Sequence, residues 1–423
     1  MIFNADASDN VYKKILRDHW VDFKKEYPWY DTSYYDELIY KLQNCRNPQK
    51  MGYAHYRCSH CGKGNRTVAM TCKSYLCLSC AKKKVDSWVC SVSKLLNPGM
   101  MYRHTVLTVP EVLRNLFWSF NDLLKKLPKY GADCLNALFS KIVRKKIKGG
   151  YIIVIQTHGR SGSYNVHLHI IATSGGFDEY DNFKEIKFFP YELLHKMWQK
   201  YLLKLLEDVL GGLSHLYIQC CKDDYPNGFV AYIDEKVVPV DFRGLARYLA
   251  KYVVAPPISV NRIDDYDGVK VTYHYKAHKT DRVEYETVPV LVFIERIIQH
   301  VMPKGINSIK HYGIQAGAVY MKYRQKFIDF CLKIGKVIKN FSKNIPGPSY
   351  RKCYQQSTGI DPLKCPYCDS EMILWEMWHP KLGIFYEGFT NALNDILLKK
   401  SKTESDFNPA GDILYHEKIL CAE

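Results

Sequence analysis

The chain has 423 residues, of which 47% are hydrophobic and 24% are charged, so it is expected to bury a core rather than to be disordered. Its 60 lysines and arginines outnumber 43 aspartates and glutamates, and the resulting net charge of +17 favours a polyanionic partner. No run approaches the roughly 18 apolar residues of a membrane-spanning helix. The first residues also lack a basic-then-apolar signal pattern. We therefore expect a cytoplasmic protein with no membrane role.

Residues 1–98 are predicted to form a helical, zinc-binding and DNA-binding domain. Amphipathic helical patterns cover residues 11–23 and 34–42, and a cysteine-rich stretch follows them. Two Cys-x-x-Cys pairs lie fifteen residues apart in this stretch, the spacing of a four-thiolate structural zinc site. Cys72 and His60 are alternative ligands for the same ion. The zinc ligands predicted from the spacing are Cys58, Cys61, Cys77 and Cys80.

Basic residues and isolated cysteines complete this part of the analysis. Three consecutive lysines, Lys82, Lys83 and Lys84, follow the last predicted zinc ligand, and we expect them to contact a phosphate backbone. Cysteines that occur in pairs, without a secretion signal, indicate a reducing compartment. The other cysteines fall in apolar or helical contexts and are expected to be small core residues. They are Cys45, Cys90, Cys134, Cys220, Cys221 and Cys331.

Residues 99–315 mix strand-like and helical patterns and are predicted to form a second domain. The elements do not alternate in a regular βαβ order, so the predicted fold class is α+β, with an antiparallel sheet flanked by helices. The predicted strands are 102–109, 151–158, 166–173, 216–221, 229–233 and 269–275. The predicted helices are 134–147, 191–210 and 242–254.

A candidate metal site lies on two of these strands. His167 and His169 are two positions apart in an apolar strand, so both imidazoles share one face and can bind one divalent ion. The preceding strand and a Gly/Ser-rich turn predict a hairpin in which Gln156 lies opposite His167. Gln156 is therefore the expected third ligand, and His158 replaces it if the turn shifts. Open coordination positions favour Mg²⁺ or Mn²⁺ as a catalytic ion.

The helix predicted over 242–254 carries a second candidate group. Tyr248 and Tyr252 are four residues apart on one helix face, with Arg247 and Lys251 in the adjacent row. A phenol with a pKa of about 10 is a poor nucleophile, so its attack on a phosphodiester requires a Lewis acid and nearby cations. We expect the two tyrosines to be catalytic nucleophiles and the two basic residues to bind DNA, although packing is the competing role in a chain with 33 tyrosines.

Residues 316–423 are predicted to form a helical C-terminal domain. A helical pattern covers 316–338. Cys365 and Cys368 then form one more Cys-x-x-Cys pair, which is half of a candidate second zinc site. Cys353 or His379 are the candidates to complete it.

Taken together, these motifs resemble the HUH-type, two-tyrosine rolling-circle transposases of bacterial insertion sequences, the insertion sequence ninety-one family. The resemblance covers most of the chain, and it is specific because the motifs occur together and in order. The segments that carry it are 58–80, 103–110, 156–159, 165–169, 246–252, 299–305, 309–313 and 361–368.

The resemblance implies that His167 and His169 bind the catalytic ion and that Tyr248 and Tyr252 are the nucleophiles. Single-stranded DNA at the transposon ends would be nicked through a 5′-phosphotyrosine intermediate, and two tyrosines would allow successive transfers to target DNA. The family fold implies a five-stranded antiparallel sheet with the histidine strand at its centre. His311 and Tyr312 are expected beside the DNA, or else packed together.

One motif departs from the family, which commonly shows His-Thr-Trp-Gly where this chain has Gln156-Thr-His158-Gly159, so the third ligand stays open between Gln156 and His158. Three other functions remain in view. A plasmid replication initiator or relaxase would share the chemistry, whereas a zinc-dependent nucleic-acid-binding protein would have none. A zinc hydrolase is disfavoured by the absence of a His-Glu-x-x-His segment. The resemblance also implies a bacterial protein associated with the nucleoid through DNA.

Overall fold

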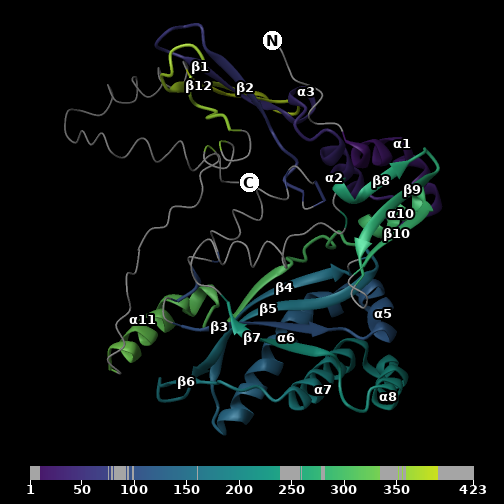
Figure 1. The fold of residues 1–423 in the computed structure, drawn as a ribbon, viewed down its shortest axis with the longest axis vertical. Helices are drawn as coiled ribbons and strands as arrows, with labels where there is room; N and C mark the ends of the chain where they lie inside the picture. Colours follow the sequence, from purple (N-terminus) through teal and green to yellow (C-terminus); the bar gives the residue numbers. More distant parts are fainter. Residues whose placement is uncertain are drawn as a thin grey trace.

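The computed structural model of the protein is shown in Figure 1. Within it, no described helix is both long enough and apolar enough to cross a membrane. The residues that the structure describes are 10–74, 76–77, 80, 92, 95–97, 100–159, 161–238, 258, 260–277, 282–333, 351, 355 and 359–388.

The main sheet is antiparallel throughout and has the histidine strand at its centre, which confirms the expected α+β class. Its five strands lie in the order β11-β4-β5-β3-β7, and the short β6 (Phe183–Glu185) pairs with the end of β5. Strand β5 is rich in β-branched residues and is buried along most of its length, as a central strand must be. The five strands are β3 (Tyr102–Thr108), β4 (Lys148–His158), β5 (Tyr164–Phe177), β7 (Ala231–Val237) and β11 (Ile309–Gly313).

Helices cover one face of this sheet. Helices α6 (Asn121–Val143) and α7 (Tyr191–Leu210) pack on each other, and α6 contacts β4 and β5. Gly131 lets α6 approach closely, because a Cβ at this position would lie 2.6 Å from Leu168 Cδ1. The short helix α5 (Arg114–Ser119) precedes α6. The helix predicted over 134–147 is α6, which begins earlier, at residue 121. It does so although it contains Pro128 and Gly131, which are poor helix formers.

One predicted strand of this region is wrong. Residues 216–221 belong to helix α8 (His215–Asp224). Leu216 is 80% exposed, whereas Cys221 is fully buried in the main core. A six-residue apolar run does not distinguish a strand from a helix by periodicity alone, and here only one side of the segment meets the core.

A second, smaller assembly joins the N-terminal helices to a later segment of the chain. Helix α1 (Val11–Glu26) packs on α2 (Ser33–Gln43) and on α10 (Val290–Ile298). Helix α10 follows a three-stranded sheet, so residues 263–298 share a hydrophobic core with the first helices. The strands of this sheet are β8 (Ile263–Tyr266), β9 (Lys270–Lys276) and β10 (Val283–Pro289).

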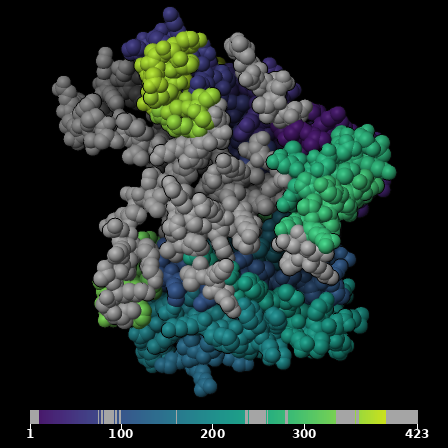
Figure 2. Space-filling view, viewed as in Figure 1, coloured from purple at the N-terminus to yellow at the C-terminus, as the bar shows by residue number. Residues whose placement is uncertain are grey.

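A third sheet pairs the β1–β2 hairpin with the last two strands of the described chain. Strand β12 (Met372–His379) lies between β1 (Tyr53–Cys58) and β13 (Gly383–Glu387), and β2 (Asn65–Ala69) pairs with the other side of β1. In Figure 2 the yellow-green C-terminal strands lie against the dark blue N-terminal ones. Helix α11 (Gly317–Lys333) confirms the described part of the helix predicted over 316–338, but the strands after it were not expected. The predicted domain boundaries remain predictions.

Candidate functional site

The β4–β5 hairpin brings three predicted ligands together. Gln156 pairs with His167 in the register that the sequence predicted. Gln156 Oε1 lies 2.9 Å from His167 Nε2 and 2.7 Å from His169 Nε2, and the two Nε2 atoms are 3.1 Å apart. Two imidazole nitrogens and an amide oxygen therefore point at a common position on one face of the central strand.

His158, the alternative ligand, has a different position. Its Nε2 lies 3.0 Å from the amide nitrogen of Gln156, not from the amide oxygen that faces His167 and His169. The amide nitrogen donates to the imidazole, so the amide oxygen is left facing His167 and His169. The geometry thus favours Gln156 as the ligand and gives His158 an orienting contact.

The imidazole of His169 is buried, that of His167 is largely buried, and both are held in one orientation. Burial lowers the pKa of His167, and burial together with the neighbouring His167 lowers the pKa of His169 well below its usual value. Both rings are therefore neutral at pH 7, which is the form that binds metals. His167 Nδ1 lies 2.8 Å from the carbonyl oxygen of Asn165 and donates to it, so its Nε2 carries the free lone pair.

His104 is a site residue that the sequence analysis did not single out. It lies on β3, next to the histidine strand, and its Nε2 is 2.9 Å from His169 Nδ1. The two rings stack with their centroids 5.1 Å apart. Burial lowers the pKa of His104 to about 4, although Asp234 opposes this effect. The available signal was a histidine within the strand predicted over 102–109, but the sequence did not predict which strand it pairs with.

His300 fixes the hairpin turn. Its Nε2 donates to the carbonyl oxygen of Gly162 at 2.9 Å, and its Nδ1 lies 3.2 Å from Thr157 Oγ1. The ring also stacks on Tyr164, which begins β5. Burial, with His158 as the next cause, lowers the pKa of His300 to about 3. A neutral histidine thus ties both arms of the hairpin whose register places Gln156 opposite His167.

Of the remaining candidates for catalysis and DNA binding, the structure describes only His311 and its neighbour Tyr312. His311 pairs with Ile152 on the edge strand β11, so it lies on the sheet face that carries Gln156. Tyr312 points to the other face and packs against the main core, so the two side chains do not pack on each other. The other candidates lie outside the described residues. They are Tyr248, Tyr252, Arg247, Lys251, Lys82, Lys83 and Lys84.

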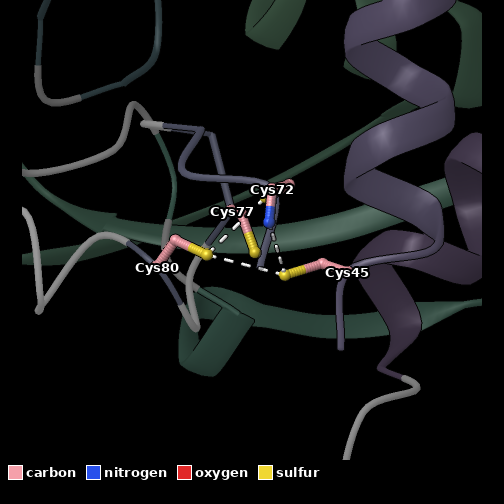
Figure 3. A group of neighbouring side chains, drawn as sticks. All are labelled: Cys45, Cys72, Cys77 and Cys80. Atoms are coloured by element: carbon pink, nitrogen blue, oxygen red, sulfur yellow. Dashed lines mark hydrogen bonds between the residues drawn. The ribbon is translucent and has the colours of Figure 1, made fainter. Parts of the chain in front are cut away.

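The cysteines form two groups of four, and the predicted single site combining Cys58, Cys61, Cys77 and Cys80 is wrong. The first group, drawn in Figure 3, joins Cys77 and Cys80 to Cys72 and Cys45, with all four sulfurs within 4.8 Å of one another. Its ligands lie in the N-terminal core, where Cys45 was expected to be only a packing residue. The β1–β2 hairpin explains the grouping, because it returns the chain and lets the Arg46 N–H donate to the Met70 carbonyl at 3.2 Å.

The second group joins the β1–β2 segment to a segment near the C-terminal end of the described chain. Cys58 and Cys61 meet Cys365 and Cys368, again with all four sulfurs within 4.8 Å. Neither predicted partner of the C-terminal pair fills this role: His379 lies at the end of β12 outside the group, and Cys353 lies outside the described residues. His60, the other alternative ligand, belongs to neither group.

Both groups fit structural zinc. A tetrahedral zinc ion with Zn–S bonds of about 2.3 Å separates its sulfurs by about 3.8 Å. The Cys45 and Cys72 sulfurs lie 3.5 and 3.6 Å from that of Cys80. Hydrogen bonds with Cys45 and Cys72 lower the pKa of Cys80, which favours the thiolate form that binds metals.

Comparisons with known proteins agree with this architecture. A family model described as "Transposase zinc-binding domain" matches residues 15–109, and one described as "Putative transposase" matches residues 150–322. The transposase for insertion sequence element IS801 of Pseudomonas savastanoi pv. phaseolicola is 27% identical over 357 residues, which cover 80% of this chain and 82% of that protein.

A second relative is the putative transposase y4qJ of Sinorhizobium fredii (strain NBRC 101917 / NGR234). It is 25% identical over 369 residues, which cover 81% of this chain and 89% of that protein. No solved structure matches the chain significantly. The zinc-binding match includes the first cysteine group, and the transposase match includes the histidine hairpin. Over most of its length the chain is therefore similar to transposases of the insertion sequence ninety-one family.

Proposed function

We propose that the protein nicks and rejoins single-stranded DNA at transposon ends through a 5′-phosphotyrosine intermediate, and that it does so with a divalent ion. The observation that carries this proposal is the convergence of His167 Nε2, His169 Nε2 and Gln156 Oε1 within 2.7–3.1 Å of one another. Three lone-pair donors placed this close together repel one another unless a cation or a proton lies between them.

The spacing of these atoms favours Mg²⁺ or Mn²⁺. Octahedral coordination at about 2.0–2.1 Å separates neighbouring ligand atoms by about 2.9 Å. A tetrahedral zinc site with bonds of the same length separates them by about 3.4 Å. The observed 2.7, 2.9 and 3.1 Å lie around the octahedral value. Three protein ligands would leave positions for phosphate oxygens and water, and the bound ion would supply Lewis-acid stabilisation of the phosphate charge.

The protein's own residues would prepare the site and supply the nucleophile. Asn165 and His104 hold the Nδ1 atoms of the two ligand histidines. A phenol oxygen of Tyr248 or Tyr252 would attack the scissile phosphorus, forming the P–O(Tyr) bond and breaking the P–O3′ bond. The phenol proton would pass, through water, to the departing 3′ oxygen, leaving a free 3′-hydroxyl. That hydroxyl can later attack a phosphotyrosine and rejoin the strand.

The basic residues would act on the substrate. Arg247 and Lys251, on the helix predicted to carry the tyrosines, would stabilise phosphate and phenolate charge. Lys82, Lys83 and Lys84 would contact the backbone of transposon-end or target DNA. The net charge of +17 supports association with nucleic acid, and hence with a bacterial nucleoid.

The three rival functions differ from the proposal either in the DNA sequence they act on or in what they require of the histidine site. A plasmid replication initiator or relaxase would use the same chemistry and differ in its DNA sequence, whereas a non-catalytic zinc protein would have no need for three converging ligands. A water-activating hydrolase would favour a carboxylate base beside the histidines. The described residues hold no metal-binding group that combines these histidines with an aspartate or glutamate. The site therefore supports strand transfer best.

The experiment uses a labelled single-stranded transposon-end oligonucleotide with Mg²⁺ or Mn²⁺. The wild-type protein should retain label through denaturation, because the DNA is covalently bound. The double variant Tyr248→Phe/Tyr252→Phe and the variant His169→Ala should retain none, whereas Tyr217→Phe, a change on the exposed side of α8, should behave as wild type. Retention of label by the double tyrosine variant would reject the proposal.

A further inference from the structure

The second cysteine group links segments that are distant in sequence. Cys61 and Cys365 are 304 residues apart, and their sulfurs lie 3.6 Å from each other. Cys58 and Cys368 are 310 residues apart and their sulfurs are also separated by 3.6 Å. The match to a transposase zinc-binding domain ends at residue 109, so it accounts for only half of this group.

Each cysteine pair sits on a tight turn that presents both of its sulfurs. On the N-terminal side, Gly62 has φ +68°, and the Cys61 N–H points at Cys58 Sγ at 3.5 Å. On the C-terminal side, Asp369 has φ +57°, and its N–H donates to the Cys365 carbonyl at 3.0 Å. The two turns have the form of zinc knuckles that face each other.

Gly64 leaves the space that the thiol of Cys365 occupies. A Cβ at this position would lie 2.3 Å from Cys365 Sγ and 3.2 Å from Cys58 Cβ. Its carbonyl also accepts the Cys58 N–H at 2.8 Å, so the backbone has no freedom to move away. Only glycine leaves room for the C-terminal thiol, which indicates that the two turns are built to meet.

The strands that carry these turns pair with each other. Strand β1 pairs with β12 from Tyr53↔Trp378 to Cys58↔Met372, and the Tyr53 hydroxyl donates to Glu376 at 2.8 Å. Among the described residues and apart from the cysteines, four buried residues form the core beneath this pairing, namely Ala54, Tyr56, Met372 and Met377, and partly buried side chains such as Val68 and Leu374 surround them. Such a small core rarely holds a sheet together without a disulfide or a metal.

We propose that Cys58, Cys61, Cys365 and Cys368 bind a second zinc ion that acts as a clasp between an N-terminal and a C-terminal segment of the chain. The ion fixes β12 against β1 and thereby closes the chain between the two knuckles, which includes the whole nuclease sheet, into a loop. The protein then carries two zinc ions per chain, and loss of the clasp ion releases the pairing of β1 with β12 while the β4–β5 hairpin stays folded. This inference does not depend on the proposed strand-transfer chemistry.

Zinc content and amide hydrogen exchange of the full-length protein test the clasp together. Wild type and Cys220→Ser, which changes an exposed thiol outside both groups, should contain two zinc ions per chain. The double variant Cys365→Ser/Cys368→Ser should contain one. Its β1 and β12 amides should exchange at least ~10-fold faster, while those of β4 and β5 stay at the wild-type rate. The variant Cys368→His, which keeps a zinc ligand, should retain two ions and slow exchange.

Three results would overturn the clasp. The first is two zinc ions in the double serine variant. The second is loss of one ion with unchanged exchange in β1 and β12, because the ion would then not hold the pairing. The third is equally fast exchange in β4 and β5, because the group would then support the whole fold rather than one junction.

Discussion

His104 Nε2 lies 2.9 Å from His169 Nδ1, and the two rings stack at an angle of 14°. This contact connects the strand β3 to the ligand set on β5. If His169 binds a metal through Nε2, its Nδ1 carries the proton and donates it to His104. The contact thus selects the tautomer of a metal ligand from outside the ligand set.

Replacing His104 should weaken metal binding without removing a ligand. We expect His104→Leu to reduce Mn²⁺ affinity by about 10- to 100-fold, the usual effect of losing such a supporting contact. His104→Gln, which keeps an acceptor, should lose less. Titration calorimetry with Mn²⁺ measures both. Equal affinities for wild type and His104→Leu would show that the contact has no role in the site.

Substitution of Gln156 and of His158 separates the two candidates for the third ligand. Gln156→Ala removes the oxygen that lies 2.7 Å from His169 Nε2, so it should abolish most Mn²⁺ binding. His158→Ala removes the contact to the amide nitrogen but leaves the amide oxygen in place, so it should have a smaller effect. Gln156→Glu should bind Mn²⁺ more tightly, because a carboxylate is a harder and charged ligand. A larger loss for His158→Ala than for Gln156→Ala would reverse the assignment.

The first cysteine group should stabilise the N-terminal core. Cys72→Ser should lose the zinc ion held with Cys45, Cys77 and Cys80, and the cost should be on the order of several kcal/mol because the ion's binding energy is coupled to folding. Trp20 is buried in the same core, so its fluorescence reports the transition. Cys220→Ser is the matched control. An unchanged unfolding temperature for Cys72→Ser would contradict a structural role for this ion.

Stability should fall in acid partly because of His300. The folded state holds the pKa of His300 at about 3, below its ordinary value of 6.5, so only the unfolded state binds this proton between those pH values. The contribution of His300 to the free energy of unfolding is therefore fully present above pH 6.5. It decreases by up to ~1.4 kcal/mol per pH unit as the pH falls towards 3.

The variant His300→Gln isolates this effect, because it can still donate to the Gly162 carbonyl but does not titrate. Denaturant unfolding at pH 7, 6 and 5 should show a shallower pH dependence for the variant than for wild type. Release of zinc in acid is common to both proteins and cancels in the difference. Identical slopes would mean that His300 is not buried as a neutral ring.

The parts of the site that are local in sequence could be predicted. A turn of a few residues joins the two strands, and period-two alternation then places Gln156 opposite His167. The central position of β5 was implied by the resemblance to the transposase family, and the burial of most of this strand agrees with it.

The parts that depend on distant segments could not. The grouping of Cys45 with Cys80, and of Cys61 with Cys365, results from chain reversals that Cys-x-x-Cys spacing does not encode. His104 has the same origin, because its contact with His169 requires the pairing of β3 with β5. Helix α8 shows that a local pattern can also mislead. Its apolar run fitted a strand as well as a helix until the exposure of its residues was known.

The most direct test of the central claim is to identify the amino acid that carries the DNA. Wild-type protein is incubated with a transposon-end single strand and Mn²⁺, digested with protease and nuclease, and analysed by mass spectrometry. The strand-transfer mechanism predicts a nucleotide on Tyr248 or Tyr252, linked through the tyrosine oxygen to a 5′-phosphate, and none when His169→Ala is used. A nucleotide on any other residue, or cleaved DNA with no nucleotide on the protein, would contradict it.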